Sequence, residues 1–381
     1  MAICFALVAI VAGSVLFHLL SPWRVTPIAS NWREMDDTLA ITFLTTAIFF
    51  VGINLLVAYM VARFRHRPGS RADYHPENKK LEGWLIVATS VAIIGLLAPG
   101  LLVYAKYVRA PAQALQLEVL GQQWQWRYRF PGASGKLGRS DTSLVSAANP
   151  FGLDPRDPAA QDNVLVNNNE VHLPLDRPVK VLLRSHDVLH DFYVPQFRAR
   201  MNMVPGMVTS FWFTPTKTGR YEVLCAQLCG VGHFNMRGIV VVEEEAKFQA
   251  WLKQQPTFAL AMAAQSPQQP AAGPGATLQA KGQSLAQSKG CVACHSVDGS
   301  AGAGPSWKGL YGKQETLADG SVVAADEDYL RKSIREPSAQ IVKGYPPIMP
   351  KMELSDDEVA ALLAYIEAMK APAAAPQQTQ K

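Results

Sequence analysis

Three long runs without charged residues lie within the first 105 positions, and they constrain the fold more than any other feature. They cover residues 1–23, 39–62 and 83–105. A helix of about 20 apolar residues spans the hydrocarbon core of a bilayer, so each run is long enough to cross a membrane. We predict a membrane segment at residues 1–110, with helices at about 1–22, 39–63 and 83–106.

The first run has a second interpretation as a cleaved secretory signal. It lacks a positively charged start and a small-residue cleavage site before Ser21 and Pro22, and signal peptides have both. A retained helix is therefore favoured, and both interpretations give the same topology.

The net charge of +5 is explained by one positively charged loop rather than by a charged partner. Six cations lie between the second and third runs: Arg63, Arg65, Arg67, Arg71, Lys79 and Lys80. Lys and Arg accumulate in cytoplasmic loops of membrane proteins. This loop is therefore predicted to be cytoplasmic and everything after Ala105 to lie outside, so the expected partner is the lipid membrane, with no nucleic acid.

The first exterior segment alternates as β-strands do. Gln125, Arg127 and Arg129 alternate with four aromatic residues: Trp124, Trp126, Tyr128 and Phe130. This period of two, repeated between Gly, Pro and Asn turns, predicts an antiparallel sandwich or barrel over residues 111–254. We expect a long surface loop at residues 132–163 and a short closing helix at residues 246–252.

Composition changes abruptly after this segment. Residues 255–278 are rich in Pro, Ala and Gln without an amphipathic pattern, which predicts a linker. A second unit at residues 279–370 ends in a predicted helix, with a capping box formed by Ser355 and Glu358. Residues 371–381 are expected to form a disordered tail.

Four soft metal ligands lie within twelve residues of the β-rich segment: Cys225, Cys229, His233 and Met236. Thiolate, imidazole and thioether suit copper in its lower oxidation state. One copper needs a single thiolate, so the second thiol is surplus unless two coppers share both sulfurs. His186 or His190 can supply the second imidazole. A disulfide is the alternative for two exterior cysteines, and the spacing of the His and Met disfavours it.

Cys291, Cys294 and His295 form a C-x-x-C-H motif, which attaches haem through two thioethers and supplies the proximal ligand. A thioredoxin-like redox pair is the alternative, but that motif accompanies a βαβ pattern, and none is visible in this part of the sequence. Met349 and Met352 are candidates for the sixth ligand. Ligation by His and Met raises the haem potential, which suits an electron carrier.

The motifs D-V-L-H-x-F-x-x-P (187–195), W-x-W-x-Y (124–128) and C-x3-C-x3-H-x2-M resemble those of subunit II of the haem-copper cytochrome c oxidases. This resemblance covers residues 30–254, and residues 279–370 resemble small c-type cytochromes, as in the haem c-fused, caa-type subunit II. It implies a multi-domain membrane protein with transmembrane helices, an all-β cupredoxin-like barrel as CuA domain and an all-α class I cytochrome c domain. The implied location is the bacterial inner membrane, multi-pass, with the CuA and haem domains on the periplasmic side.

The resemblance assigns the ligands of binuclear copper (CuA): His190, Cys225, the carbonyl of Gln227, Cys229, His233 and Met236. It assigns covalently bound haem c to Cys291, Cys294 and His295, with Met349 as sixth ligand. Most relatives have Glu where Gln227 stands, and that Glu contributes to a magnesium site at the subunit I interface. Whether this chain holds magnesium there stays open.

Two further positions match the family by their place in its motifs. Trp124 is expected to be the point where electrons reach CuA, with a core aromatic as the alternative. Glu82 lies where the family has a Glu at the mouth of a proton pathway into subunit I, although its spacing to Trp84 is one residue shorter than usual. A carboxylate favoured by the helix N-terminus is the alternative.

The implied function is that of the subunit through which electrons enter a terminal respiratory cytochrome c oxidase, with oxygen reduction and coupled proton translocation in subunit I. Expected partners are subunit I, other oxidase subunits, and cytochrome c or a cytochrome bc complex as donor. Two alternatives stay open: the corresponding subunit of a CuA-containing nitric oxide reductase, and a copper-binding assembly factor. Such factors lack the His233 and Met236 spacing.

Overall fold

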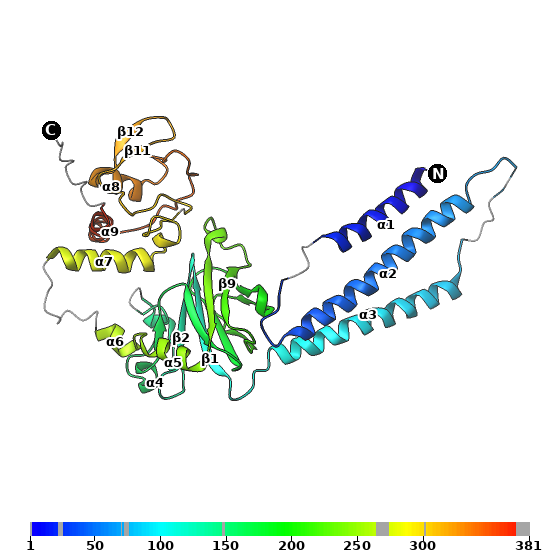
Figure 1. Ribbon diagram of the computed structural model, residues 1–381, viewed down its shortest axis with the longest axis horizontal. Coiled ribbons are helices and arrows are strands. Elements are labelled where there is room, and N and C mark those ends of the chain that lie inside the picture. Colours follow the sequence, from blue (N-terminus) through cyan, green and yellow to red (C-terminus); the bar gives the residue numbers. More distant parts are fainter. Residues whose placement is uncertain are drawn as a thin grey trace, which may run out of the picture.

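The computed structural model describes residues 2–21, 26–69, 71, 76–146, 149–263, 274–300 and 302–370. Three parts follow one another along the chain: a stalk of long helices, a β-sandwich and a small helical domain (Figure 1). The predicted tail at residues 371–381 lies outside the described residues.

The stalk consists of α1 (Ala2–Leu20), α2 (Arg33–Arg63) and α3 (Lys79–Tyr107), each long and apolar enough to cross a membrane. α2 and α3 begin six and four residues before the predicted starts, because polar first turns extend both helices beyond their apolar runs. α1 packs along α2, where Cys4 Sγ lies 3.4 Å from the carbonyl of Ala58.

The stalk is joined to the sandwich by hydrogen bonds at its base. Ser30 Oγ donates to the carbonyl of Phe197 (2.7 Å), and Trp32 Nε1 donates to that of Trp212 (2.7 Å). At the end of α3, the hydroxyl of Tyr107 accepts from the backbone N–H of Arg200 (2.9 Å). The sandwich is therefore held close to one end of the predicted membrane helices.

The sandwich is built from two five-stranded sheets. One has the order β3-β2-β1-β5-β8, from β1 (Leu115–Gln122), β2 (Gln125–Phe130), β3 (Val164–Val166), β5 (Val179–Ser185) and β8 (Thr209–Phe213). The other has the order β4-β10-β9-β6-β7, from β4 (Glu170–Pro174), β6 (His190–Val194), β7 (Ala199–Met203), β9 (Gly219–Cys225) and β10 (Arg237–Glu243).

The expectation of a purely antiparallel sandwich was wrong, because β1 pairs with β5 and β4 pairs with β10 in parallel. Parallel neighbouring strands cannot be joined by a hairpin and need a long crossover connection. Between β1 and β5, and again between β4 and β10, the chain contributes at least one strand to the other sheet before it returns. The all-β cupredoxin-like class itself is confirmed.

Strand β2 is buried on both faces, although its alternation suggested one exposed face. Trp126, Tyr128 and Phe130 fill the space between the sheets. The other face is covered by residues 132–163, which contain the 3-10 turn η2 (Thr142–Leu144) and the short helix α4 (Pro158–Gln161). The expected surface loop is thus a packed cover, which buries Phe151 and Leu153.

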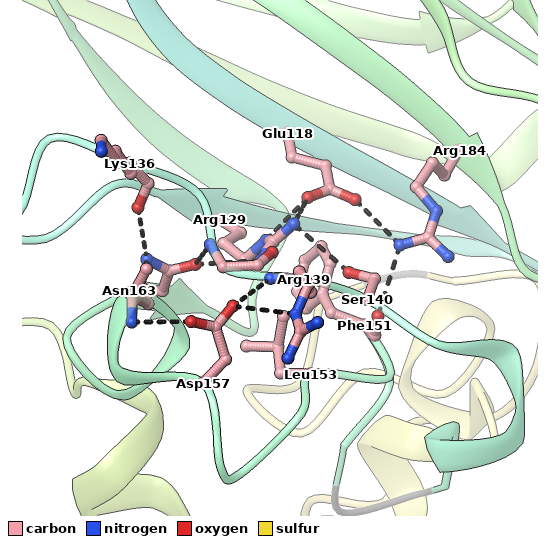
Figure 2. A network of polar contacts seen from close by, with 12 residues as sticks. Glu118, Arg129, Lys136, Arg139, Ser140, Phe151, Leu153, Asp157, Asn163 and Arg184 are labelled. Carbon is pink, nitrogen blue, oxygen red and sulfur yellow. Dashed lines mark hydrogen bonds and ion pairs between the residues drawn. The ribbon is translucent and has the colours of Figure 1, made fainter.

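A buried ion pair holds this cover on the sheet (Figure 2). Arg129 donates from Nε to Glu118 Oε2 (2.7 Å), and both side chains are at most 4% exposed. Arg129 Nη1 also donates to Asn163 Oδ1 and to the carbonyl of Gly138, both at 2.9 Å. Arg184 Nη1 contacts the other Glu118 oxygen at 3.2 Å. Every charge in the network therefore has an opposite partner, as buried charges require.

The predicted linker at residues 255–278 is helical at both ends. After α5 (Glu245–Lys253), the helix α6 (Phe258–Ala263) buries Phe258 against the cover, and α7 (Pro274–Ser288) already belongs to the C-terminal domain. The composition of residues 255–278 did not predict α6, because a single apolar side chain, Phe258, anchors this helix. Residues 264–273 lie outside the described residues.

The C-terminal domain packs α7 against α9 (Asp356–Ala368), with α8 (Glu327–Arg335) and the 3-10 turn η5 (Cys291–Ala293) beside them. Gly282 lets the two helices touch, since a Cβ there would lie 1.9 Å from the carbonyl of Ala361. The capping box of Ser355 and Glu358 is present. A small hairpin, β11 (Gln314–Thr316) with β12 (Val322–Ala324), was not anticipated.

Arg129→Ala should lower the free energy of unfolding by about 3–5 kcal/mol, because it leaves Glu118 buried with a single peripheral partner. Arg139→Ala is the matched control: its side chain is 79% exposed, its two carboxylate contacts are 3.5 and 3.8 Å long, and such pairs contribute about 0–1 kcal/mol. Denaturant unfolding of the whole chain in detergent, followed by tryptophan fluorescence, measures both. Equal losses would contradict a stabilising role for the buried pair.

Candidate metal centre

The soft ligands meet at one end of the second sheet. His190 is the first residue of β6 and Cys225 the last of β9, and these strands pair so that Phe192 lies opposite Cys225. The loop that follows turns through η4 (His233–Asn235) and returns to the sheet at β10. Local chain geometry therefore brings together ligands from two neighbouring strands and one loop.

The two cysteine sulfurs lie 3.7 Å apart at the middle of this cluster. His190 Nδ1 is 3.9 Å from Cys225 Sγ, and His233 Nδ1 is 3.6 Å from Cys229 Sγ. A disulfide has an S–S distance of about 2.0 Å, so the thiols are free, as they are throughout the described residues. One imidazole beside each of two neighbouring sulfurs is the arrangement that a sulfur-bridged metal pair requires.

Weaker ligands complete the cluster. Met236 Sδ lies 3.9 Å from Cys229 Sγ, and the carbonyl of Gln227 lies 3.2 Å from Cys225 Sγ. His190 is fully buried, whereas the alternative imidazole, His186, is exposed. The donor set of two thiolates, two imidazoles, a thioether and a carbonyl fits binuclear copper.

The two sulfurs are close enough to share one hydrogen bond, in which either can donate. The hydrogen bond with Cys229 lowers the pKa of the Cys225 thiol, and the same bond raises the pKa of Cys229. The lowered pKa favours the thiolate form of Cys225. Metal binding must displace the remaining proton, which couples loading to pH.

Asp187 orients the buried imidazole, a role that its place in the sequence motif did not reveal. Its Oδ1 lies 2.8 Å from His190 Nε2, and its Oδ2 accepts from the backbone N–H of Gln123 (2.8 Å). Burial opposes ionisation of Asp187, but these hydrogen bonds outweigh it and lower its pKa. Burial opposes protonation of His190, but its interactions with Asp187 and Cys225 together outweigh burial and raise the pKa of the imidazole. The ring is thereby fixed with Nδ1 toward the sulfurs.

A cavity of about 580 Å³ opens in the C-terminal domain beside the C-x-x-C-H motif. It is lined by Cys291, Cys294 and His295, and also by both Met349 and Met352. Its volume is in the usual range of cofactor sites, about 300–1,000 Å³. Both methionines reach the cavity, so the choice between them stays a prediction.

His295 is prepared for iron ligation. Its Nδ1 lies 2.8 Å from the carbonyl of Pro305, to which it donates, so Nε2 is left for a metal. Burial lowers the pKa of His295, which favours the neutral ring. Gly304 leaves room for this ring, because a Cβ there would lie 2.6 Å from His295 Cε1. These residues fit a covalently attached haem.

Trp124 lies in the turn between β1 and β2 rather than within a strand. It is 9% exposed, and its Nε1 donates to the carbonyl of Cys229 (3.2 Å). Gly232 makes room for the indole, since a Cβ there would lie 2.3 Å from Trp124 Cδ2. Trp124 also lines the cavity of the C-terminal domain. It therefore contacts both candidate cofactor sites, which a simple core aromatic would not.

Glu82 is far from both sites. It lies exposed in the first turn of α3, at the end of the stalk remote from the sandwich (Figure 1). Its backbone N–H donates to the carbonyl of Asn78, the helix N-cap (2.9 Å). This position agrees equally with a proton-path role and with simple N-terminal stabilisation.

Comparison with known proteins matches both exterior parts. Residues 115–244 match the family "Cytochrome C oxidase subunit II, periplasmic domain", and residues 279–370 match "Cytochrome c". The alternative cytochrome c oxidase subunit 2 of Bradyrhizobium diazoefficiens is 56% identical over 259 residues, which cover 68% of this chain and 94% of the relative.

Cytochrome c oxidase subunit 2 of Alkalihalophilus pseudofirmus is 24% identical over 345 residues, or 88% of this chain and 86% of the relative. A match of that length must extend into the C-terminal domain. Among solved structures, the periplasmic domain of oxidase subunit II (CoxB) of Bradyrhizobium japonicum is 25% identical and covers 38% of this chain and 95% of its own, with a TM-score of 0.28.

Cys229→Ser should abolish the two-copper centre, because a hydroxyl is a poor ligand for copper in its lower oxidation state and cannot bridge the pair. Haem content should stay unchanged, since the haem motif lies in another domain. Cys4→Ser, in α1, is the control and should leave both intact. Copper analysis and electron paramagnetic resonance of the purified protein measure the result; an unchanged content of two coppers in Cys229→Ser would refute the bridging role.

Proposed function

Because the chain belongs to the subunit II family of cytochrome c oxidases, we propose that electrons enter an oxidase through it, first at a haem c site and then at a binuclear copper site. Its relatives are components of haem-copper oxidoreductases, and so is this chain. When bound, haem c and the copper pair each accept and release single electrons at little structural cost. The protein's contribution is to hold both sites rigidly and close together.

One observation carries this proposal: Trp124 touches both sites. Its indole N–H bonds to the carbonyl of Cys229, and its ring lines the cavity beside Cys291 and Cys294. A single buried side chain thus connects the haem-attachment motif to a copper ligand. The path lies within one polypeptide, so no diffusional encounter separates the two sites.

The remaining assignments follow from the same role. Subunit I and other oxidase subunits are the proposed partners, with oxygen reduction and proton translocation there, and cytochrome c or a cytochrome bc complex as donor. The proposed location is the bacterial inner membrane, with both exterior domains in the periplasm. Gln227 is proposed to supply its backbone carbonyl to copper. Glu82 is proposed at the start of a proton path.

Trp124→Phe should slow electron transfer from photoreduced haem c to the copper site, because it removes the N–H bond to Cys229 while keeping an aromatic ring. Copper and haem content should not change. Trp251→Phe, in α5 and outside the cavity lining, is the matched control and should transfer at the wild-type rate. Transient absorption of the complete oxidase measures these rates; no slowing in Trp124→Phe would exclude this route.

Met349→Ala should change haem absorption and lower its reduction potential, because a thioether ligand raises the potential of His-ligated haem. Met352→Ala should leave both unchanged. The two positions line the same cavity, so each serves as the control for the other. Spectra and redox titration of the full chain decide, and the reverse pattern would assign the sixth ligand to Met352.

A further inference from the structure

We propose that the C-terminal domain rests docked on the sandwich through a backbone contact between Gly290 and Gln123, and that this contact sets the distance between the two cofactor sites. The inference rests on the proposed function. It names the surface through which the two sites communicate and the residue that permits their approach.

The first observation is that the haem cavity crosses the domain boundary. Most of its lining, Lys289, Gly290 and Cys291 included, comes from the C-terminal domain. Four residues of the sandwich also line it: Gln123, Trp124, Gly230 and Val231. The turn that contacts Cys229 therefore forms part of the haem cavity.

The second observation is the closeness of the backbones. Gly290 immediately precedes Cys291 and has a left-handed conformation, with φ of 73°. A Cβ at this position would lie 2.8 Å from the carbonyl oxygen of Gln123 and 3.4 Å from the backbone nitrogen of Trp124. Ala293, in the next turn, packs against the hydrophobic core of the sandwich. Only glycine allows the haem-attachment turn to come this near.

The third observation makes Gln123 a positioning residue. Its carbonyl faces Gly290, while its side-chain Nε2 donates to the carbonyl of Cys229 (2.8 Å). Its backbone N–H donates to Asp187, which in turn holds His190. A shift of the docked domain at Gln123 would therefore reach both a copper thiolate and a copper imidazole.

The contact does not depend on long-range charge. Gly290, Ala293, Gln123, Trp124 and Val231 carry none. Among the described residues, Lys289 next to Gly290 lies 3.6 Å from Glu358, and Asp187 next to Gln123 is bonded to His190, so both charges have partners within their own domains. A tether maintains a local concentration of about millimolar order without electrostatic attraction. Electron transfer between the two sites should thus be insensitive to salt, which screens exposed charges.

Docking also decides where an external donor can act. Trp124 is 9% exposed with the C-terminal domain in place. A soluble electron donor therefore cannot stack on this indole while the domain is docked. It must deliver electrons to the C-terminal domain instead.

The test compares Gly290→Ala with Gly320→Ala in the complete, cofactor-loaded oxidase. Both glycines are left-handed, with φ of 73° and 89°, so an alanine costs similar backbone strain at either position. A Cβ at Gly320 would meet nothing within 4 Å, whereas one at Gly290 would clash with Gln123. Only Gly290→Ala should slow haem-to-copper transfer and expose residues 121–126 to hydrogen exchange.

Val231→Asp is a second variant, which places a charge on the sandwich side of the haem cavity, outside the fold of the haem domain. Val231 is 52% exposed with the domain docked, so the new charge should weaken the docking rather than abolish it, even if Gly290→Ala fails to attach haem. Wild-type rates and exchange protection in both Gly290→Ala and Val231→Asp would overturn the docking proposal. Absence of haem-to-copper transfer in the unmodified protein would instead overturn the proposed function, with the exchange protection still reporting whether the domains dock.

Discussion

The close pair of sulfurs at the end of β9 is the constraint on which the rest of the structure depends. Two thiols 3.7 Å apart cannot both ionise cheaply without a metal, and the opposite pKa shifts of Cys225 and Cys229 express that conflict. A metal pair would resolve it by replacing the remaining proton. The sandwich supplies what this needs: a strand pairing that sets one imidazole beside Cys225, and a loop that returns another beside Cys229.

The candidate copper ligands could be proposed from the sequence because their geometry is mostly local. Cys225, Cys229, His233 and Met236 occupy one strand end and one loop, so their spacing encodes their convergence. The haem motif is local for the same reason. His190 is distant in sequence, and family resemblance rather than spacing singled it out from His186; the structure places it, and not His186, beside the sulfurs.

Features that depend on tertiary packing escaped the sequence. The alternation in β2 predicted a strand but could not show that residues 132–163 fold over its polar face, because that requires the buried pairing of Arg129 with Glu118. In the sequence, Asp187 was only the first residue of a motif, and Gln123 was not singled out. Their roles come from contacts across the sandwich, with His190 in one case and with Cys229 in the other. The parallel strand pairs were missed because alternation does not encode strand direction.

Joining the two domains changes what the surface around Trp124 must do. A surface that captures a diffusing partner benefits from complementary charge, since steering raises the association rate. A tethered domain needs no steering, so short-range fit can take its place, and the neutral contact at Gly290 and Gln123 has that character. Such a close fit does not tolerate added volume, because one methyl group at Gly290 would separate the backbones of the two domains. The same tether that removes the need for charge thus makes a single glycine decisive for the approach of the two sites.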